Sequence, residues 1–312
     1  MNSSIRAFLI VIITTIAIIS CEQKRNMDEI AFAKAPLVTP ASENVLKREI
    51  SQEFKEYWYA GKAEISSYKL EQARYGEMRD GNAVLIFVTE DFLPEKQVKA
   101  DRQNDKNIPV LKLNATKNFN TGIYPYSVMS STFYPVFNEQ HAIKVSSSMQ
   151  EWCGHVYAQL NNRNSYEITS HSYFENDADK EFSINKDILE NELWTQLRLN
   201  PADLPVGTLK IIPDFSYTRM KHIPVKAFNA IATLTTNSYT LEYPELNRKL
   251  VLNFESTFPY TITSWEETYK DGYGPNAKEL TTKATKIKTI KSPYWGKNSN
   301  KDSILREELG LN

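Results

Sequence analysis

The stretch around Cys153 combines residue types suited to nucleophilic chemistry. Cys153 and His155 make a candidate thiol nucleophile and base, because an imidazole can accept the proton of a thiol. On a strand, however, side chains two residues apart lie ~6.6 Å from each other at a rise of ~3.3 Å per residue. That spacing disfavours direct contact. The alternative is that Cys153 is a buried structural cysteine.

The histidines do not form a recognisable metal-binding pattern. There are 4 of them, at positions 141, 155, 171 and 222, and their spacing matches no typical zinc site. Asn161–Asn164 are predicted to form a hairpin loop, which would pair Leu160 with Ser165 and turn His171 away from Cys153. We therefore expect no metal and no cofactor.

Other catalytic patterns are also missing. Glu266 and Glu267 are adjacent, so on a strand they face opposite sides and cannot flank one bond; a solvated strand is the simpler interpretation. No phosphate-binding glycine loop and no G-x-S-x-G elbow occurs, and only 10 glycines are present. Lys and Arg number 37 against 38 acidic residues, for a net charge of −1. Neither nucleotide nor nucleic acid is expected as a partner.

Aromatic residues are the remaining candidates for ligand binding. If the ends of a curved sheet carry them, they could hold a lipid, a glycan or an apolar peptide. The alternative is ordinary packing in the core and at its rim. The candidates are Tyr57, Trp58, Tyr124, Tyr126 and Trp152.

The elements that would position these side chains are mainly strands. Segments rich in Val, Ile, Thr, Tyr and Phe recur at short spacing, which is typical of an antiparallel sheet. They cover 83–89, 111–115, 142–160, 165–175, 206–212, 226–235, 238–243, 248–254, 260–269 and 281–291. Turns are predicted at Arg79-Asp80-Gly81, Pro244–Asn247 and Asp271–Gly274. We predict a mainly β protein, with a curved antiparallel sheet or partly open barrel.

Two amphipathic helices are predicted beside the sheet. One covers about 43–60 with Ser42 as its cap, and the other covers about 185–199 with Asn185 as its cap. The second would pack on the sheet or plug one end of a barrel. Residues 46–312 are predicted to form a single β-rich domain, and 21–45 a flexible tether.

Residues 1–20 have the pattern of an export signal. Arg6 precedes an apolar stretch of about 13 residues, or ~20 Å as a helix, which is too short for the ~30 Å hydrocarbon core of a bilayer. The segment Ile18-Ile19-Ser20-Cys21 resembles the lipobox of bacterial lipoproteins. That resemblance implies cleavage after Ser20 and acyl chains on Cys21, which would anchor the protein stably in a membrane.

Further stretches resemble a family of Gram-negative envelope lipoproteins, some of them labelled septum formation inhibitor Maf. These stretches are Glu56–Ile65, Val88–Gln97 and Ser148–His155. The Ser-x-x-Arg-Arg stretch of the true Maf nucleotide pyrophosphatases is absent. The resemblance implies an address in the envelope, but it does not indicate an activity or any site residues. By analogy with lipoproteins, Glu22 after the cysteine does not mark retention at the inner membrane, and Gln23-Lys24-Arg25-Asn26 lack the acidic cluster associated with surface export. We therefore expect an outer-membrane position that faces the periplasm.

Three functions remain open from the sequence. The first is a non-enzymatic, lipid-anchored protein that binds a hydrophobic ligand, a glycan or an envelope partner. The second is a thiol-dependent or hydrolytic envelope enzyme that uses Cys153 and His155. The third is a structural subunit of an envelope assembly.

Overall fold

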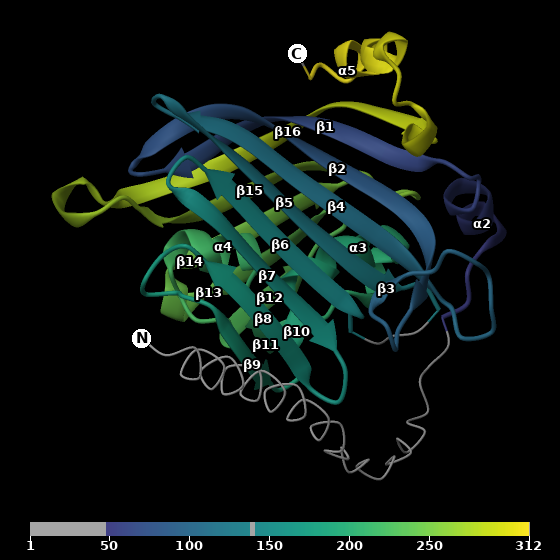
Figure 1. The fold of residues 1–312 in the computed structure, drawn as a ribbon, viewed down its shortest axis with the longest axis horizontal. Helices are drawn as coiled ribbons and strands as arrows, with labels where there is room; N and C mark the ends of the chain where they lie inside the picture. Colours follow the sequence, from purple (N-terminus) through teal and green to yellow (C-terminus); the bar gives the residue numbers. More distant parts are fainter. Residues whose placement is uncertain (1–47, 138–140, 312) are drawn as a thin grey trace, which may run out of the picture. The chain divides into compact units, whose positions relative to one another are not determined.

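The computed structural model describes residues 48–137 and 141–311. These residues form one compact unit. Most of its described residues lie in β-strands, and 16 strands join in one large, curved sheet (Figure 1). The predicted fold class, mainly β with a curved and partly open antiparallel sheet, is confirmed.

Nine strands make up the first part of the sheet. They are β1 (Ala63–Arg74), β2 (Glu77–Leu93), β3 (Val98–Lys99), β4 (Ile108–Thr121), β5 (Tyr124–Pro135), β6 (Lys144–Glu151), β7 (Gly154–Asn162), β8 (Tyr166–Ser172) and β9 (Lys180–Ile184). Apart from the short β3, each pairs antiparallel with the next along the chain. This part is a meander of hairpins.

The second part of the sheet continues from the other side of β1. Its strands are β10 (Ile188–Leu189), β11 (Gly207–Ile212), β12 (Phe228–Leu234), β13 (Ser238–Tyr243), β14 (Arg248–Phe254), β15 (Ile262–Asp271) and β16 (Lys278–Ser292). Because β16 pairs antiparallel with β1, the last strand joins the two parts. The order ends with β10 on one side and β9 on the other, so the sheet is open.

The alternation of strand direction brings many hairpin turns to one end of the sheet. We call this the aromatic end. It comprises turns 75–76, 122–123, 152–153, 173–179 and 272–277.

Two helices lie within the curve of the sheet (Figure 1). They are α3 (Glu190–Leu199), which packs against β4 and β5, and α4 (Phe215–Lys221), which packs against β5 and β6. The helix α2 (Gln52–Trp58) lies at one end of the strands, where Phe54 and Trp58 join the main core, and α5 (Ile304–Glu308) lies outside the curve. The sequence did not predict α4 or α5.

Both predicted helices begin later than expected. In α2 the hydroxyl oxygen of Ser51 accepts the N–H of Phe54 at 3.0 Å, so Ser51 caps the helix, and residues 48–50 are not helical. Ser42 lies outside the described residues. In α3 the expected cap Asn185 is wrong, because the strand β10 comes first and the Glu192 carboxylate accepts the N–H of Leu189 at 3.1 Å.

Most predicted strands are confirmed, but one predicted turn is wrong. The segments 238–243 and 248–254 coincide with β13 and β14. Arg79-Asp80-Gly81 lies inside β2, and the chain turns instead at Tyr75-Gly76. Gly76 there has a φ of +77°, a conformation that glycine adopts without strain.

Within the described part of the chain, no helix has the length and apolar character needed to cross a membrane.

Candidate functional site

The concave face of the sheet carries a row of small side chains. The register places Ala115 opposite Ser130, Ser130 opposite Ser147, Ser147 opposite Ala158 and Ala158 opposite Ser170. We call these five residues of β4 to β8 the concave row. Ser130 and Ser147, on the two strands that α4 packs against, are buried. On this face, one space lies on either side of α4.

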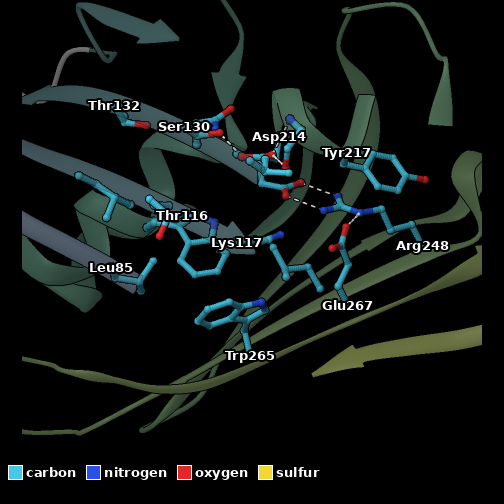
Figure 2. A pocket seen from close by; sticks show the side chains of 18 residues that line it. Leu85, Thr116, Lys117, Ser130, Thr132, Asp214, Tyr217, Arg248, Trp265 and Glu267 are labelled. Carbon is cyan, nitrogen blue, oxygen red and sulfur yellow. Dashed lines mark hydrogen bonds and ion pairs between the residues drawn. The ribbon is translucent and has the colours of Figure 1, made fainter. Parts of the chain in front are cut away.

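The first space is the inner cavity, of about 50 Å³, which lies between the sheet and both inner helices. Figure 2 shows side chains approaching it from β4, β14, β15 and α4. Its apolar walls include Leu85, Leu113, Val128, Trp194 and Trp265. Its polar lining includes Lys117, Asn191, Asp214, Ser216, Arg248 and Glu267.

A buried ion-pair cluster borders the inner cavity (Figure 2). The Arg248 guanidinium donates to both carboxylate oxygens of Glu190, at 2.5 and 2.6 Å, and to Glu267 at 2.7 Å. Burial by itself lowers the pKa of Arg248, but the two carboxylates outweigh it and raise the pKa well above its ordinary value. This cluster joins α3 to β14 and β15, and its charges already have partners.

The second space is the outer groove, of about 330 Å³, between α4 and strands β7 to β9. Its apolar floor comprises Val156, Ala158, Phe182, Phe215, Ile223 and Val225. Its polar rim comprises Ser170, Ser172, Asn176, Asp177, Lys180, Arg219 and His222. Two larger hollows, of about 500 and 460 Å³, lie on loop 93–106 and beside the C-terminal segment, where most of the lining is polar or charged.

One carboxylate fastens α4 to the turn between β8 and β9. Asp177 Oδ2 lies 3.3 Å from the Arg219 guanidinium and 3.1 Å from Nδ1 of His222. Ser216 and Tyr217 line the inner cavity, whereas Phe215, Thr218 and Arg219 line the outer groove. The helix α4 therefore divides the concave face into the two spaces.

The candidate thiol does not line either of these two spaces. Cys153 is exposed, in the two-residue turn between β6 and β7, so the interpretation as a buried cysteine is wrong. Its backbone N–H donates to Glu151 at 2.9 Å, and a hydrogen bond with the same carboxylate raises the pKa of the thiol. His155 is exposed at the start of β7. A raised pKa is the opposite of what activates a thiol.

The predicted register of the hairpin formed by β7 and β8 is also wrong. Asn162 pairs with Tyr166, so the loop is shorter than expected, and His171 lies opposite Tyr157. Because Tyr157 and His155 are two residues apart on one strand, His171 shares a face with His155. His171 pairs with Asp179 at 3.3 Å. Among the residues that the structure describes, no group of His, Cys, Asp and Glu could hold a metal ion.

The five aromatic candidates fall into two separate groups. Trp58 is 1% exposed and packs against Phe87 in the core, and Tyr57 donates to Glu64 at 2.5 Å. The other three lie together at the aromatic end. The ring centroid of Tyr124 is 5.9 Å from that of Tyr126 and 6.4 Å from that of Trp152.

Glu266 and Glu267 face opposite sides of the sheet, as predicted, but only Glu266 faces solvent. Glu266 pairs with exposed Lys283 at 3.3 Å, while Glu267 is 4% exposed and binds Arg248. Sequence reasoning missed Arg248 and Glu190 altogether. A buried charge in a strand or a helix has no local pattern, and Arg248 and Glu190 are 58 residues apart in the sequence.

Comparisons with known proteins add two structural similarities. A β-barrel-like protein of a domain of unknown function from Brucella abortus aligns over 73% of this chain and 97% of its own, with 6% identity and a TM-score of 0.42. A porin-like protein from Bacteroides uniformis aligns over 72% and 96%, with 10% identity and a TM-score of 0.22. No family model matches the chain. No curated protein matches it either.

Proposed function

We propose that this chain is a lipid-anchored protein of the bacterial outer membrane that binds an amphiphilic small ligand on the concave side of its sheet, without chemistry. The outer groove is the observation that supports ligand binding. Its volume of about 330 Å³ falls within the range of ~300–1,000 Å³ that is usual for ligand pockets. It also combines an apolar floor with a few polar groups at the rim, which suits a ligand with an apolar and a polar part.

The strength of such binding would come from the floor of the groove. Burial of apolar surface contributes about 25 cal/mol per Å². Arg219 and Lys180 exceed the charge of Asp177 at the rim, so the rim favours a polar or anionic part of the ligand at the open side. An open groove with an apolar floor matches a binding role better than the exposed and unactivated Cys153 matches catalysis.

Two substitutions on one strand test the groove. Ala158→Trp fills it, whereas Gln159→Trp adds the same ring to the opposite face of β7. With the purified full-length protein, we expect Ala158→Trp to weaken binding of a fluorescent naphthylamine dye at least tenfold, and Gln159→Trp to leave it unchanged. Equal binding by both variants would exclude the groove as the site.

The anchor has its own test, because Cys21 lies outside the described residues. We expect mass spectrometry of the native N-terminus to find acyl chains on Cys21, and Cys21→Ser to release the protein from outer-membrane fractions. An unmodified Cys21 in membrane-derived protein would contradict the proposed anchoring.

A second candidate function, binding of an envelope protein, is favoured by the aromatic end. Four large side chains at neighbouring turns are exposed there: Ile123 (82%), Trp152 (68%), Tyr173 (72%) and Tyr273 (68%). Exposed aromatic side chains are common at protein interfaces. Cross-linking in cells should capture a partner that Trp152→Ala loses and Tyr59→Ala, a substitution of an exposed residue away from this end, retains.

A further inference from the structure

Three polar groups without partners line the inner cavity. The indole N–H of Trp265 and the amide oxygen of Asn191 make no hydrogen bond with any described residue, although these side chains are only 2% and 4% exposed. Lys117, which is only half-buried, lines the same cavity from β4, as Figure 2 shows, and forms no hydrogen bond or ion pair with a described residue. A buried donor or acceptor without a partner is costly, so native proteins keep few of them. The cost of burial without a partner therefore applies to Trp265 and Asn191.

The carboxylates beside the cavity do not meet this need. Both Glu190 and Glu267 are bound by Arg248. Asp214 accepts from the amide nitrogen of Asn191 and from Ser216, and it caps α4. With these carboxylates already paired, a molecule inside the cavity, either water or a ligand, would supply the partners of the unpaired groups.

The three groups specify the chemistry of that molecule. An indole N–H and an ammonium need acceptors, and the charge of the ammonium favours an anionic one. The amide oxygen of Asn191 needs a donor. A volume of about 50 Å³ holds three or four water-sized groups, at ~10–15 Å³ each. A carboxylate with a hydroxyl close to it has the required two kinds of group and the required size.

We propose that the inner cavity binds the polar end of a hydroxylated fatty acid, such as a 3-hydroxy acid. Its carboxylate accepts from Lys117 and Trp265, and its hydroxyl donates to Asn191. This inference rests on the proposed function and specifies the class of ligand.

In this proposal the hydrocarbon part of the ligand follows the concave row. The row runs from Ala115 and Ser130 at the inner cavity to Ala158 and Ser170 at the outer groove. Because α4 packs over the middle of this row, the hydrocarbon of the proposed ligand would have to displace α4 from β5 and β6. The apolar floor of the groove then covers the far end of the hydrocarbon.

Binding of three matched probes tests the inference. The purified full-length protein is titrated with 3-hydroxydecanoate, decanoate and 1-decanol, and binding is followed by tryptophan fluorescence and by calorimetry. We expect 3-hydroxydecanoate to bind at least tenfold more tightly than either of the others. Equal affinities for the three probes would overturn the inference.

Variants separate the cavity from the groove. Lys117→Met and Trp265→Phe, which keep apolar bulk, should each remove most of the preference for the hydroxy acid. Lys69→Met, which removes an exposed lysine on β1, should retain it. If Lys117→Met and Trp265→Phe keep the preference, the inner cavity holds water only, while binding of the naphthylamine dye to the groove would still support the proposed function. If the wild-type protein binds neither the dye nor the three probes, both the inference and the proposed function are refuted.

Discussion

At the residue scale, Cys153 shows how one neighbour decides the reactivity of a side chain. The thiol is exposed, and its hydrogen bond with Glu151 raises its pKa, so little thiolate is present at neutral pH. We expect Glu151→Gln to speed alkylation of Cys153 by iodoacetamide several-fold at pH 7.5, because the variant loses the negative charge. A rate that is unchanged, measured beside Glu175→Gln as the control, would show that the carboxylate does not govern the thiol.

His141 gives a prediction about pH. Burial by itself lowers its pKa, but the Glu192 carboxylate, 2.8 Å from Nδ1, outweighs burial and raises it. A raised pKa in the folded state means that the protonated imidazole stabilises the fold. This contribution is complete below the unfolded pKa of about 6.5 and is lost as pH rises through the folded pKa.

We therefore expect His141→Gln to reduce the free energy of unfolding more at pH 5.5 than at pH 9. Urea denaturation at the two pH values measures the difference, and His155→Gln, at an exposed position, is the control. A pH-independent effect of His141→Gln would contradict the role of the ion pair.

At the element scale, the sequence predicts strands well where apolar and polar residues alternate. The segment 238–243 alternates over its whole length, the segment 248–254 is rich in Leu, Val and Phe, and the boundaries of both agree with the structure. The predicted turn at 79–81 is wrong because Gly81 is needed inside the strand for packing. A Cβ at this position would lie 2.2 Å from the carbonyl oxygen of Asn118. Close approach of two strands, which no local pattern reveals, requires this glycine.

The candidate site was harder to predict than the strands. Lys117, Asn191 and Trp265 come from β4, α3 and β15, and each belongs to a different part of the sequence. Only the curvature of the sheet and its register bring them to one cavity. The helix α4, which divides the site, has only 7 residues, too few for a clear helical period.

The C-terminal segment is the element whose role is most directly testable. Leu309 and Leu311 pack outside the sheet on Ile65, Val84 and Val88, and the carbonyl of Leu309 accepts from the Ser67 hydroxyl at 2.5 Å.

We expect Leu309→Ala to lower the free energy of unfolding by about 2 kcal/mol, at the low end for a buried leucine because the segment can adjust. Ile304→Ala, 58% exposed, should change it by less than about 0.5 kcal/mol. Urea denaturation of the two variants gives both values, and similar values would show that the segment contributes nothing to the core.

At the scale of the whole molecule, buried ion pairs connect the inner helix α3 to distant parts of the sheet. Arg198, at the end of α3, donates to both oxygens of Glu64 on β1, each at 2.7 Å. Glu190, at its start, binds Arg248 on β14. The helix thus joins strands that lie apart in the sheet order, which supports unfolding of the body as one unit.

Arg248 provides the sharpest test of this connection. Arg248→Met leaves the carboxylates of Glu190 and Glu267, 1% and 4% exposed, without a counter-charge, which typically costs about 3–5 kcal/mol. The triple variant Arg248→Met, Glu190→Gln, Glu267→Gln removes the buried charges together, so we expect it to be more stable than the single variant. Guanidinium denaturation followed by both tryptophan fluorescence and circular dichroism measures this order. A triple variant that is less stable than the single variant would contradict this expectation. It would show that the charged cluster stabilises the fold more than neutral side chains in its place, and that the cavity beside it depends on these charges.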